Sequence, residues 1–248
     1  MPTQKNKQTP PLLEHFRIRK EPIQYIIIHC SRSHPQRMIE IMKENGVSAH
    51  YIIDRQGNVT EVIKEQDVAY HSGISNWHNS PVQSLNETSI GIELQCPSMG
   101  QSKRSYNTKM IEALCVLLKR LQQKYNISKE HILAHSDVAP ERKPDPGAWF
   151  PWKKLYQKGL IYWYDERSLA KEKDEEKLLK DIGYDITDLS AARYAFCRRW
   201  LHEEVLFDKE MQHLLDNPYP KNFQPKDKKR YIKRLRAVAK AVEKIRQE

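Results

Sequence analysis

Ala134-His-Ser-Asp-Val-Ala-Pro-Glu-Arg-Lys-Pro-Asp-Pro-Gly147 is the most informative stretch of the sequence. It places an imidazole, His135, near a lysine ammonium, Lys143, and a carboxylate, Asp145. The prolines on both sides of Asp145 fix their own φ angles and favour extended backbone in the residues before them. A carboxylate on a stiff loop loses little entropy when it is held in one place. The stretch therefore suits a metal ligand or a catalytic group.

Short β-branched runs alternate with helical patterns over the first 150 residues. Residues 108–125 repeat their apolar positions at helical spacing, and Asn107 is a suitable N-cap. Interleaved strands and helices predict an α/β fold, with a mixed β-sheet flanked by helices. The predicted strands are residues 25–29, 49–54, 58–63, 88–94 and 131–134, and a further helix is predicted over residues 38–45, ending at Gly46.

After Trp152 the strand signal almost disappears, so we expect a second, all-helical region. Its helical patterns run around residues 169–182, 190–204 and 226–245. The predicted organisation is an N-terminal arm (1–22), a catalytic α/β domain (23–160) and a small helical domain (161–248).

Composition indicates a polar, soluble protein of 248 residues with a mean hydropathy of −0.79. The net charge is +10, of which residues 226–248 contribute +7, so the basic excess is local and does not make the main domain a nucleic-acid binder. No apolar run approaches the ~18 residues of a membrane span, and the first residues lack a signal-peptide core. We therefore expect a cytoplasmic protein with reduced cysteines and no transmembrane segment, with the periplasm or cell envelope as the alternative.

Two histidines and a carboxylate from distant segments form a candidate metal-ligand set. His29 ends the first buried strand, and His135 and Asp145 lie in the opening stretch. Each alone is more often structural, but together they suit Zn²⁺ with an open fourth position for water. Glu93 is a candidate base and Lys143 a candidate oxyanion stabiliser. The alternatives are a solvated strand glutamate and a surface ion pair.

Five motifs then occur in the order typical of one family. Together they resemble the zinc-dependent N-acetylmuramoyl-L-alanine amidases of type 2, whose fold is shared by phage amidases and peptidoglycan-recognition proteins. The resemblance covers roughly residues 22–155. The motifs are YIIIH (25–29), SAHYIIDRQGNV (48–59), AYHSGIS (69–75) followed by Trp77, NETSIGIEL (86–94) and AHSDVAPERKPDPG (134–147).

The resemblance implies roles for individual residues. Zinc ligation falls on His29, His135 and Asp145, catalysis on Glu93 and stabilisation of the transition state on Lys143. Positions that shape the substrate site fall on Tyr51, His71 and Asn86, although His50 and His71 could instead pack in the core or support a metal ligand. Glu141 departs from the family, which usually has glycine there, and this raises the question of loop geometry and substrate clearance.

The function implied is hydrolysis of the amide bond between N-acetylmuramic or 1,6-anhydro-N-acetylmuramic acid and the L-alanine of peptidoglycan stem peptides. The alternatives are a non-catalytic peptidoglycan-recognition module on the same fold and a nucleic-acid binder that uses the basic tail. Residues 178–200 resemble a small three-helix peptidoglycan-binding domain, which implies muropeptides and polymeric peptidoglycan as partners. The basic helix over 226–245 would either pack on that domain or attract anionic wall polymer or lipid headgroups.

Overall fold

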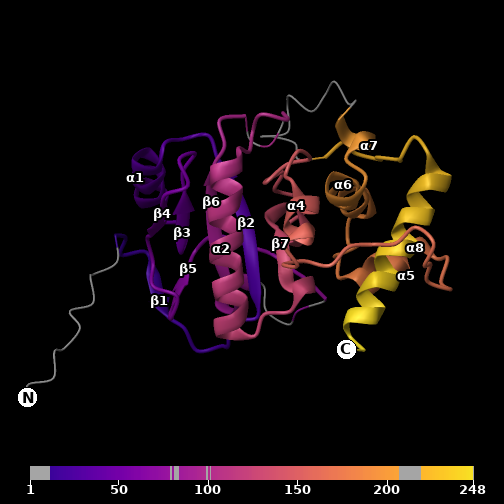
Figure 1. Cartoon of the computed structure of the whole chain (residues 1–248), viewed down its shortest axis with the longest axis horizontal. Helices are drawn as coiled ribbons and strands as arrows, with labels where there is room; N and C mark the ends of the chain where they lie inside the picture. The colour runs from indigo at the N-terminus through magenta and orange to yellow at the C-terminus, as the bar shows by residue number, and fades with distance from the viewer. Residues whose placement is uncertain are drawn as a thin grey trace, which may run out of the picture.

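A five-stranded mixed sheet, in the order β4-β3-β6-β2-β7, forms the centre of the N-terminal part (Figure 1). The computed structural model describes residues 12–78, 80, 84–98, 100, 102–206 and 219–247. β2 is parallel to β6 and β7, β3 is parallel to β6, and β3 and β4 form an antiparallel hairpin. The predicted α/β class is confirmed. The strands are β2 (Tyr25–Ser31), β3 (Tyr51–Ile53), β4 (Val59–Glu61), β6 (Ser89–Gln95) and β7 (Ile132–Ala134).

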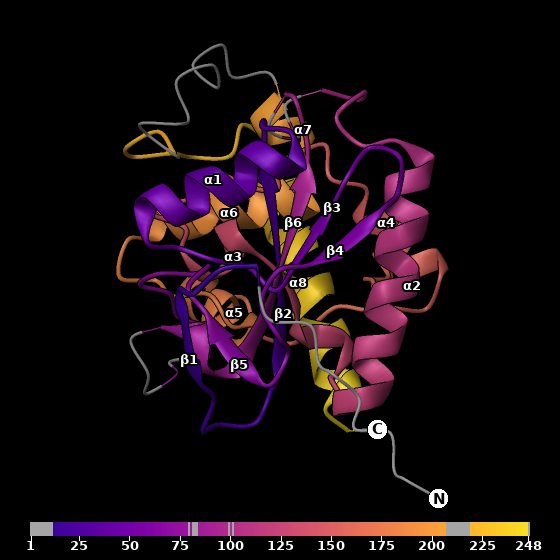
Figure 2. The same cartoon turned by 90° about the vertical axis from the view of Figure 1, so that its left-hand side faces the viewer.

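Helices cover both faces of this sheet, as Figure 2 shows for α1 and α2. α2 (Thr108–Tyr125) buries its apolar stripe against the sheet face that carries Ile92. Its predicted N-cap is confirmed, because Asn107 Oδ1 accepts a hydrogen bond from the Met110 amide at 3.0 Å. α1 (Pro35–Asn45) packs on the other face and ends, as predicted, at Gly46 with φ 65°.

Part of the expected N-terminal arm is a strand instead. β1 (Phe16–Ile18) pairs antiparallel with β5 (Asp67–Ala69) in a separate two-stranded sheet. Arg19 follows β1 and donates hydrogen bonds to the backbone carbonyls of Asp67 and Ser89. Three residues, two of them exposed, are too few to show a strand period, which explains why the sequence did not predict β1. Residues 1–11 of the predicted arm lie outside the described residues.

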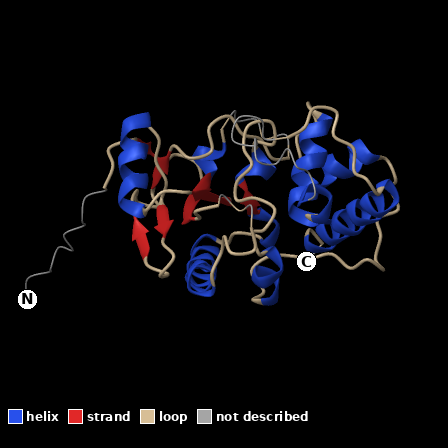
Figure 3. Cartoon of the chain, turned by 90° about the horizontal axis from the view of Figure 1, so that it is seen from above, coloured by secondary structure: helices blue, strands red, loops and turns tan. Residues whose placement is uncertain are grey.

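The C-terminal helices gather at one end of the molecule, away from the hairpin (Figures 1 and 3). The predicted helix over 169–182 begins only at residue 175, because Asp174 caps it by accepting from the Lys177 amide at 2.8 Å. The predicted helix over 190–204 is divided after Trp200 into two. The helices are α3 (His135–Val138), α4 (Trp152–Gln157), α5 (Glu175–Ile182), α6 (Leu189–Trp200), α7 (Glu203–Leu206) and α8 (Lys228–Ile245).

The apolar stripe of α8 packs within the protein, which is the first of the two expected alternatives. Leu235, Val238 and Val242 are buried in a cluster that also contains side chains of α5 and α6. The same cluster includes Ile27 of β2 and Leu133 of β7. These two strands and the C-terminal helices therefore share one hydrophobic cluster, which extends across the boundary predicted at residue 161. None of the helices within the described residues has the length and apolar character of a membrane crossing.

A buried ion pair fixes α3, which carries the start of the metal-site loop, against α6. Asp137 is fully buried and accepts hydrogen bonds from the Ala134 amide and the Tyr184 hydroxyl, both at 2.8 Å. Arg199 of α6 donates to Asp137 and also to the Ile132 carbonyl of β7. Because every partner is buried, breaking this network would leave an unpaired charge in the core. The C-terminal helices thus help to position the loop that starts at His135.

Candidate metal centre

His29, His135 and Asp145 converge at one edge of the sheet. β2 and β7 are parallel neighbours, so His29 near the end of β2 and His135 directly after β7 reach the same edge. The two Nδ1 atoms lie 2.9 Å apart, and Asp145 Oδ2 lies 3.1 Å from Nδ1 of His135 and 3.3 Å from Nδ1 of His29. All three side chains are buried. The structure therefore brings the predicted ligand set together.

The spacing of these three atoms fits a tetrahedral metal ion. Zinc bonds of about 2.0–2.2 Å at tetrahedral angles place neighbouring ligand atoms about 3.3 Å apart. The observed separations of 2.9–3.3 Å are close to that value. Two imidazoles and one carboxylate also leave a fourth position free, as in hydrolytic zinc sites. The cluster can hold a metal ion.

The electrostatics of the cluster favour the ligand forms of the side chains. Burial, together with the neighbouring His135, lowers the pKa of His29 to about 4, so its imidazole is neutral at pH 7. Neutral imidazole and ionised carboxylate are the forms that bind metal.

Contacts along the stretch 134–147 hold Asp145 in place. The Asp145 carbonyl accepts from the Ser136 amide at 2.9 Å, and the next carbonyl, of Pro146, accepts from the Tyr106 hydroxyl at 2.5 Å. Gly100 has φ 71°, and a Cβ there would lie 1.8 Å from the Pro146 oxygen, so only glycine fits beside this loop.

Glu141 requires no unusual backbone. Among the described non-glycine residues, φ is positive only at His78, Asn126 and Asn222. The left-handed conformation that would favour glycine is therefore not used at position 141. Its side chain lines a neighbouring cavity and not the cavity of the metal cluster.

Glu93 and Lys143 line the same cavity of ≈ 450 Å³ as the three candidate ligands. Glu93 lies directly opposite His29 in the β2–β6 pairing, so strand register brings it to the site. Its Oε2 atom is buried and has no hydrogen-bond partner among the described residues. Burial and the Asp145 carboxylate raise the pKa of Glu93 to about 8. The cavity thus holds an uncommitted carboxyl group and an ammonium beside the cluster.

His71 and Asn86 also line this cavity, but their polar atoms contact protein groups. His71 Nδ1 lies 3.0 Å from Nε2 of His29, and Asn86 Oδ1 accepts from the amides of His71 and Ser72. The sequence did not single out Ser72, whose carbonyl lies 3.2 Å from His135 Nε2. His50 is fully buried, and its Nδ1 accepts from the Gly91 amide at 3.0 Å.

The prediction that Tyr51 lies at the substrate cleft is wrong. Tyr51 pairs in register with Ile92, so it points to the sheet face opposite to that of Glu93. Its hydroxyl contacts Glu65 and Arg120 on the α2 side, and its side chain is 5% exposed. Tyr51 therefore helps to join the hairpin to α2 and does not line the cavity.

Glu65 lies at the centre of this contact, and we expect it to make the free energy of unfolding depend on pH in the acid range. Burial alone would raise its pKa, but hydrogen bonds from Lys124, Tyr125, Tyr51 and Arg120 lower it to about 2. A carboxylate whose pKa is lower in the folded than in the unfolded state stabilises the fold above pH ~4.5. This contribution is lost as the pH falls toward ~2 and the carboxylate is protonated. We expect Glu65→Gln to lower the free energy of unfolding at pH 7 by about 2 kcal/mol.

Urea unfolding between pH 7 and pH 2 measures this effect. The Glu65→Gln variant should show a flatter stability profile below pH 5 than the native chain. Glu112→Gln, an exposed position on α2, serves as the control and should follow the native profile. If the free energy of unfolding of Glu65→Gln falls with pH as steeply as that of the native chain, the Glu65 network is not the cause of the acid sensitivity.

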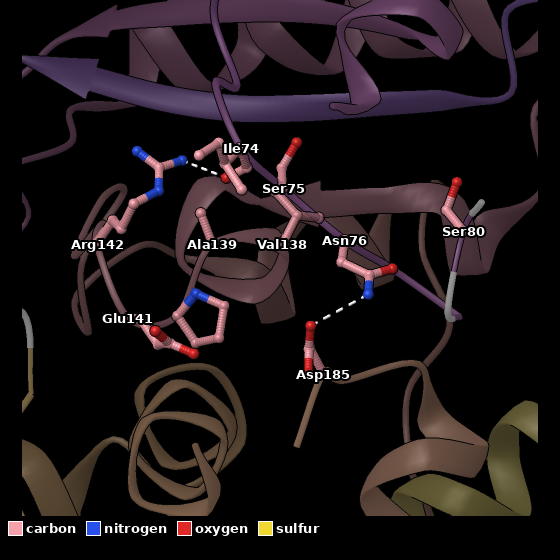
Figure 4. Close-up of a pocket in the computed structure, with 10 residues that line it drawn as sticks. Ile74, Ser75, Asn76, Ser80, Val138, Ala139, Glu141, Arg142 and Asp185 are labelled. Atoms are coloured by element: carbon pink, nitrogen blue, oxygen red, sulfur yellow. Dashed lines mark hydrogen bonds between the residues drawn. The ribbon is translucent and has the colours of Figure 1, made fainter. Parts of the chain in front are cut away.

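A second cavity, of ≈ 440 Å³, adjoins the first (Figure 4). Arg142 lines both cavities and donates to the carbonyls of Ser72 and Ile74. On the far side, Asn76 donates to Asp185, which follows α5, at 3.1 Å. Two buried apolar residues also line this cavity: Val138, the last residue of α3, and Ala139, which follows it. A ligand longer than one residue could therefore extend from the metal cluster toward the C-terminal helices.

The fold and the arrangement of the candidate site are those of the type 2 amidase family. A family model described as N-acetylmuramoyl-L-alanine amidase matches residues 19–148, more than half of the chain, and the protein belongs to this family. AmiD of Escherichia coli is 33% identical over 157 residues, covering 58% of this chain and 55% of AmiD. The 1,6-anhydro-N-acetylmuramyl-L-alanine amidase AmpD of Haemophilus influenzae is 34% identical over 109 residues, covering 44% of this chain and 56% of AmpD. The chain thus spans little more than half the length of these relatives.

Two solved structures superpose on a larger part of the chain than these sequence alignments cover. The E. coli AmiD structure, a complex with the substrate anhydro-N-acetylmuramic acid-L-Ala-D-γ-Glu-L-Lys, superposes with a TM-score of 0.69 at 25% identity and covers 91% of each chain. AmpDh3 of Pseudomonas aeruginosa, in complex with anhydromuramic pentapeptide, gives a TM-score of 0.67 at 21% identity and covers 98% of each chain. The second likeness supports the fold alone. Both alignments extend over the C-terminal helices as well as the sheet.

Proposed function

We propose that the protein is a zinc amidase that cleaves the bond between the lactyl group of (1,6-anhydro-)N-acetylmuramic acid and L-alanine. The observation that carries this proposal is the convergence of His29, His135 and Asp145 beside the unpartnered Glu93 in one cavity. Family membership supports the reaction class. A recognition module would have no need of the free carboxyl group of Glu93.

Different residues of the chain have separate roles in amide hydrolysis. Held by His29, His135 and Asp145, a zinc ion would polarise the amide carbonyl and make water more acidic. Glu93 accepts the proton of the attacking water and passes it to the departing alanine amine. The Lys143 ammonium, at the wall of the same cavity, stabilises the negative charge that develops on the carbonyl oxygen.

The protonation of Glu93 fits this role once the positive charge of the metal is included. Burial and Asp145 place the pKa of the carboxyl group at about 8. A nearby dication lowers the pKa of a carboxyl group. The result is a pKa closer to neutrality, where a general base is most effective because it is both available and basic enough.

We propose soluble anhydro-muropeptides as the preferred substrates. The substrate bound in the E. coli AmiD complex and the name of AmpD support this class. We also propose that the protein binds polymeric peptidoglycan. The outer face of α8 carries the exposed residues Lys228, Lys229 and Lys233, which can attract an anionic polymer.

Turnover on anhydro-muropeptides and on purified sacculi, measured side by side by release of stem peptide, tests this preference. We expect faster release from the soluble substrate. We also expect binding to sacculi to weaken with added salt and in a variant with the three α8 lysines changed to glutamine, without loss of turnover on the soluble substrate. Release from sacculi alone would contradict the proposed preference.

A further inference from the structure

Two consecutive residues, His71 and Ser72, contact the outward-facing nitrogens of both histidine ligands. We propose that this segment fixes which ring nitrogen of each histidine carries the proton, so that both Nδ1 atoms present lone pairs to the metal. The inference rests on the proposed metal centre. It makes Asn86 a positioning residue, where the resemblance predicted a residue that shapes the substrate site. For His71 it favours the alternative of a residue that supports a metal ligand.

The tautomer of His135 follows from its contact with a carbonyl. His135 Nε2 lies 3.2 Å from the backbone oxygen of Ser72. A carbonyl oxygen can only accept, so Nε2 must carry the hydrogen. A neutral imidazole has one N–H group, and Nδ1 of His135 is therefore left with its lone pair directed at Asp145 and His29.

A chain of three hydrogen bonds fixes His29 in the same way. The Ser89 hydroxyl donates its one hydrogen to the Leu85 carbonyl at 2.5 Å, so it accepts from Nε2 of His71 at 3.2 Å. With its hydrogen on Nε2, His71 accepts at Nδ1 from Nε2 of His29, at 3.0 Å. Nδ1 of His29 is consequently the free acceptor. The chain begins at a backbone carbonyl, which cannot reverse its role.

Together these contacts direct three lone-pair atoms at one point. Nδ1 of His29, Nδ1 of His135 and Oδ2 of Asp145 lie within 3.3 Å of one another, and no hydrogen is left to share between them. Such an arrangement is repulsive unless a cation lies between the atoms. The outer contacts therefore preorganise the cluster for a metal ion.

Two features hold the His71–Ser72 segment in position. Asn86 Oδ1 accepts from the His71 amide at 3.0 Å, the Ser72 amide at 2.8 Å and the Ser72 hydroxyl at 2.9 Å. Gly91 of β6 leaves space for the His71 ring, because a Cβ at that position would lie 2.4 Å from His71 Cγ. A side chain at position 91 would displace the ring from His29.

Zinc affinity of His71 variants, measured on the full chain by competition with a chromogenic chelator, tests the inference. His71→Ala removes the acceptor for His29, and we expect zinc affinity to fall by about 10–100-fold. His71→Asn places an amide oxygen near the position of Nδ1 and should retain affinity within a few-fold. Ser89→Ala, which releases the proton on His71, should also weaken binding and gives a second reading if His71→Ala folds poorly.

Controls separate positioning from stability and from the proposed reaction. His78, which contacts Arg246 and lines neither cavity, provides a control: His78→Ala should bind zinc as the native chain does. Thermal unfolding of the metal-free variants reports any loss of stability. If His71 had a purely structural role, His71→Ala would lower the stability and His71→Asn would not restore zinc affinity. Native affinity in His71→Ala, or equal losses in the Ala and Asn variants, would overturn the inference. Zinc binding without muropeptide cleavage in the native chain would instead refute the proposed function and leave this inference standing.

Discussion

Asp145→Ala is expected to abolish hydrolysis of muropeptides and to release the metal. Asp145 is the one anionic member of the cluster, and its oxygen lies 3.1 and 3.3 Å from the two imidazole nitrogens. Without it, two neutral nitrogens remain to hold a dication. Metal-assisted polarisation contributes several kcal/mol to catalysis, so turnover should fall by at least about a thousandfold.

Zinc content by atomic emission and release of stem peptide by liquid chromatography measure the two losses together. Asp165→Ala, at an exposed residue paired with Arg167, is the matched control and should retain both metal and turnover. A chelator should reproduce the loss in the native chain, and added Zn²⁺ should reverse it. Native turnover by a metal-free Asp145→Ala variant would rule out the metal mechanism.

Glu93→Gln is expected to lower turnover by about 10²–10⁴-fold while the protein keeps its zinc. Glutamine has nearly the shape of glutamate but cannot accept a proton from water at neutral pH. Since Glu93 Oε2 has no hydrogen-bond partner among the described residues, the substitution breaks no contact that holds the fold. The loss should therefore appear in kcat, with little change in affinity for a muropeptide.

This variant also separates an enzyme from a recognition module on the same fold. A non-catalytic binder would show no turnover in the native chain, and Glu93→Gln would change neither activity nor affinity. Glu44→Gln, at an exposed position on α1, is the control for the loss of one negative charge. Equal kcat in the native and Glu93→Gln proteins would assign the base to another group.

The positions of His29 and His135 were predictable because they follow from short local patterns, whereas their assignment as zinc ligands came from the resemblance to the amidase family. His29 lies near the end of an apolar strand, His135 follows another, and parallel neighbours bring such ends to one edge. Glu93 follows in the same way from the alternation of residues 88–94. These signals need no knowledge of long-range packing beyond the pairing of the strands.

Other features depend on tertiary contacts that no local pattern reveals. Alternation along residues 51–53 gives two possible faces for Tyr51, and only the register with Ile92 decides between them. The role of Ser72 is exerted through its backbone carbonyl, for which residue type carries no signal. β1 is similarly specified by its partner β5 and not by its own three residues.

The most direct test of the central claim is the identity of the products from a purified anhydro-muropeptide. Mass spectrometry and labelling of new amino groups would be applied with zinc present and after chelation. We expect one water to be added per bond, which gives a sugar fragment with a free lactyl carboxylate and a peptide that begins with the amino group of L-alanine. Chelation should abolish both products. Uncleaved substrate with the zinc-loaded protein, or cleavage within the peptide or the sugar, would contradict it.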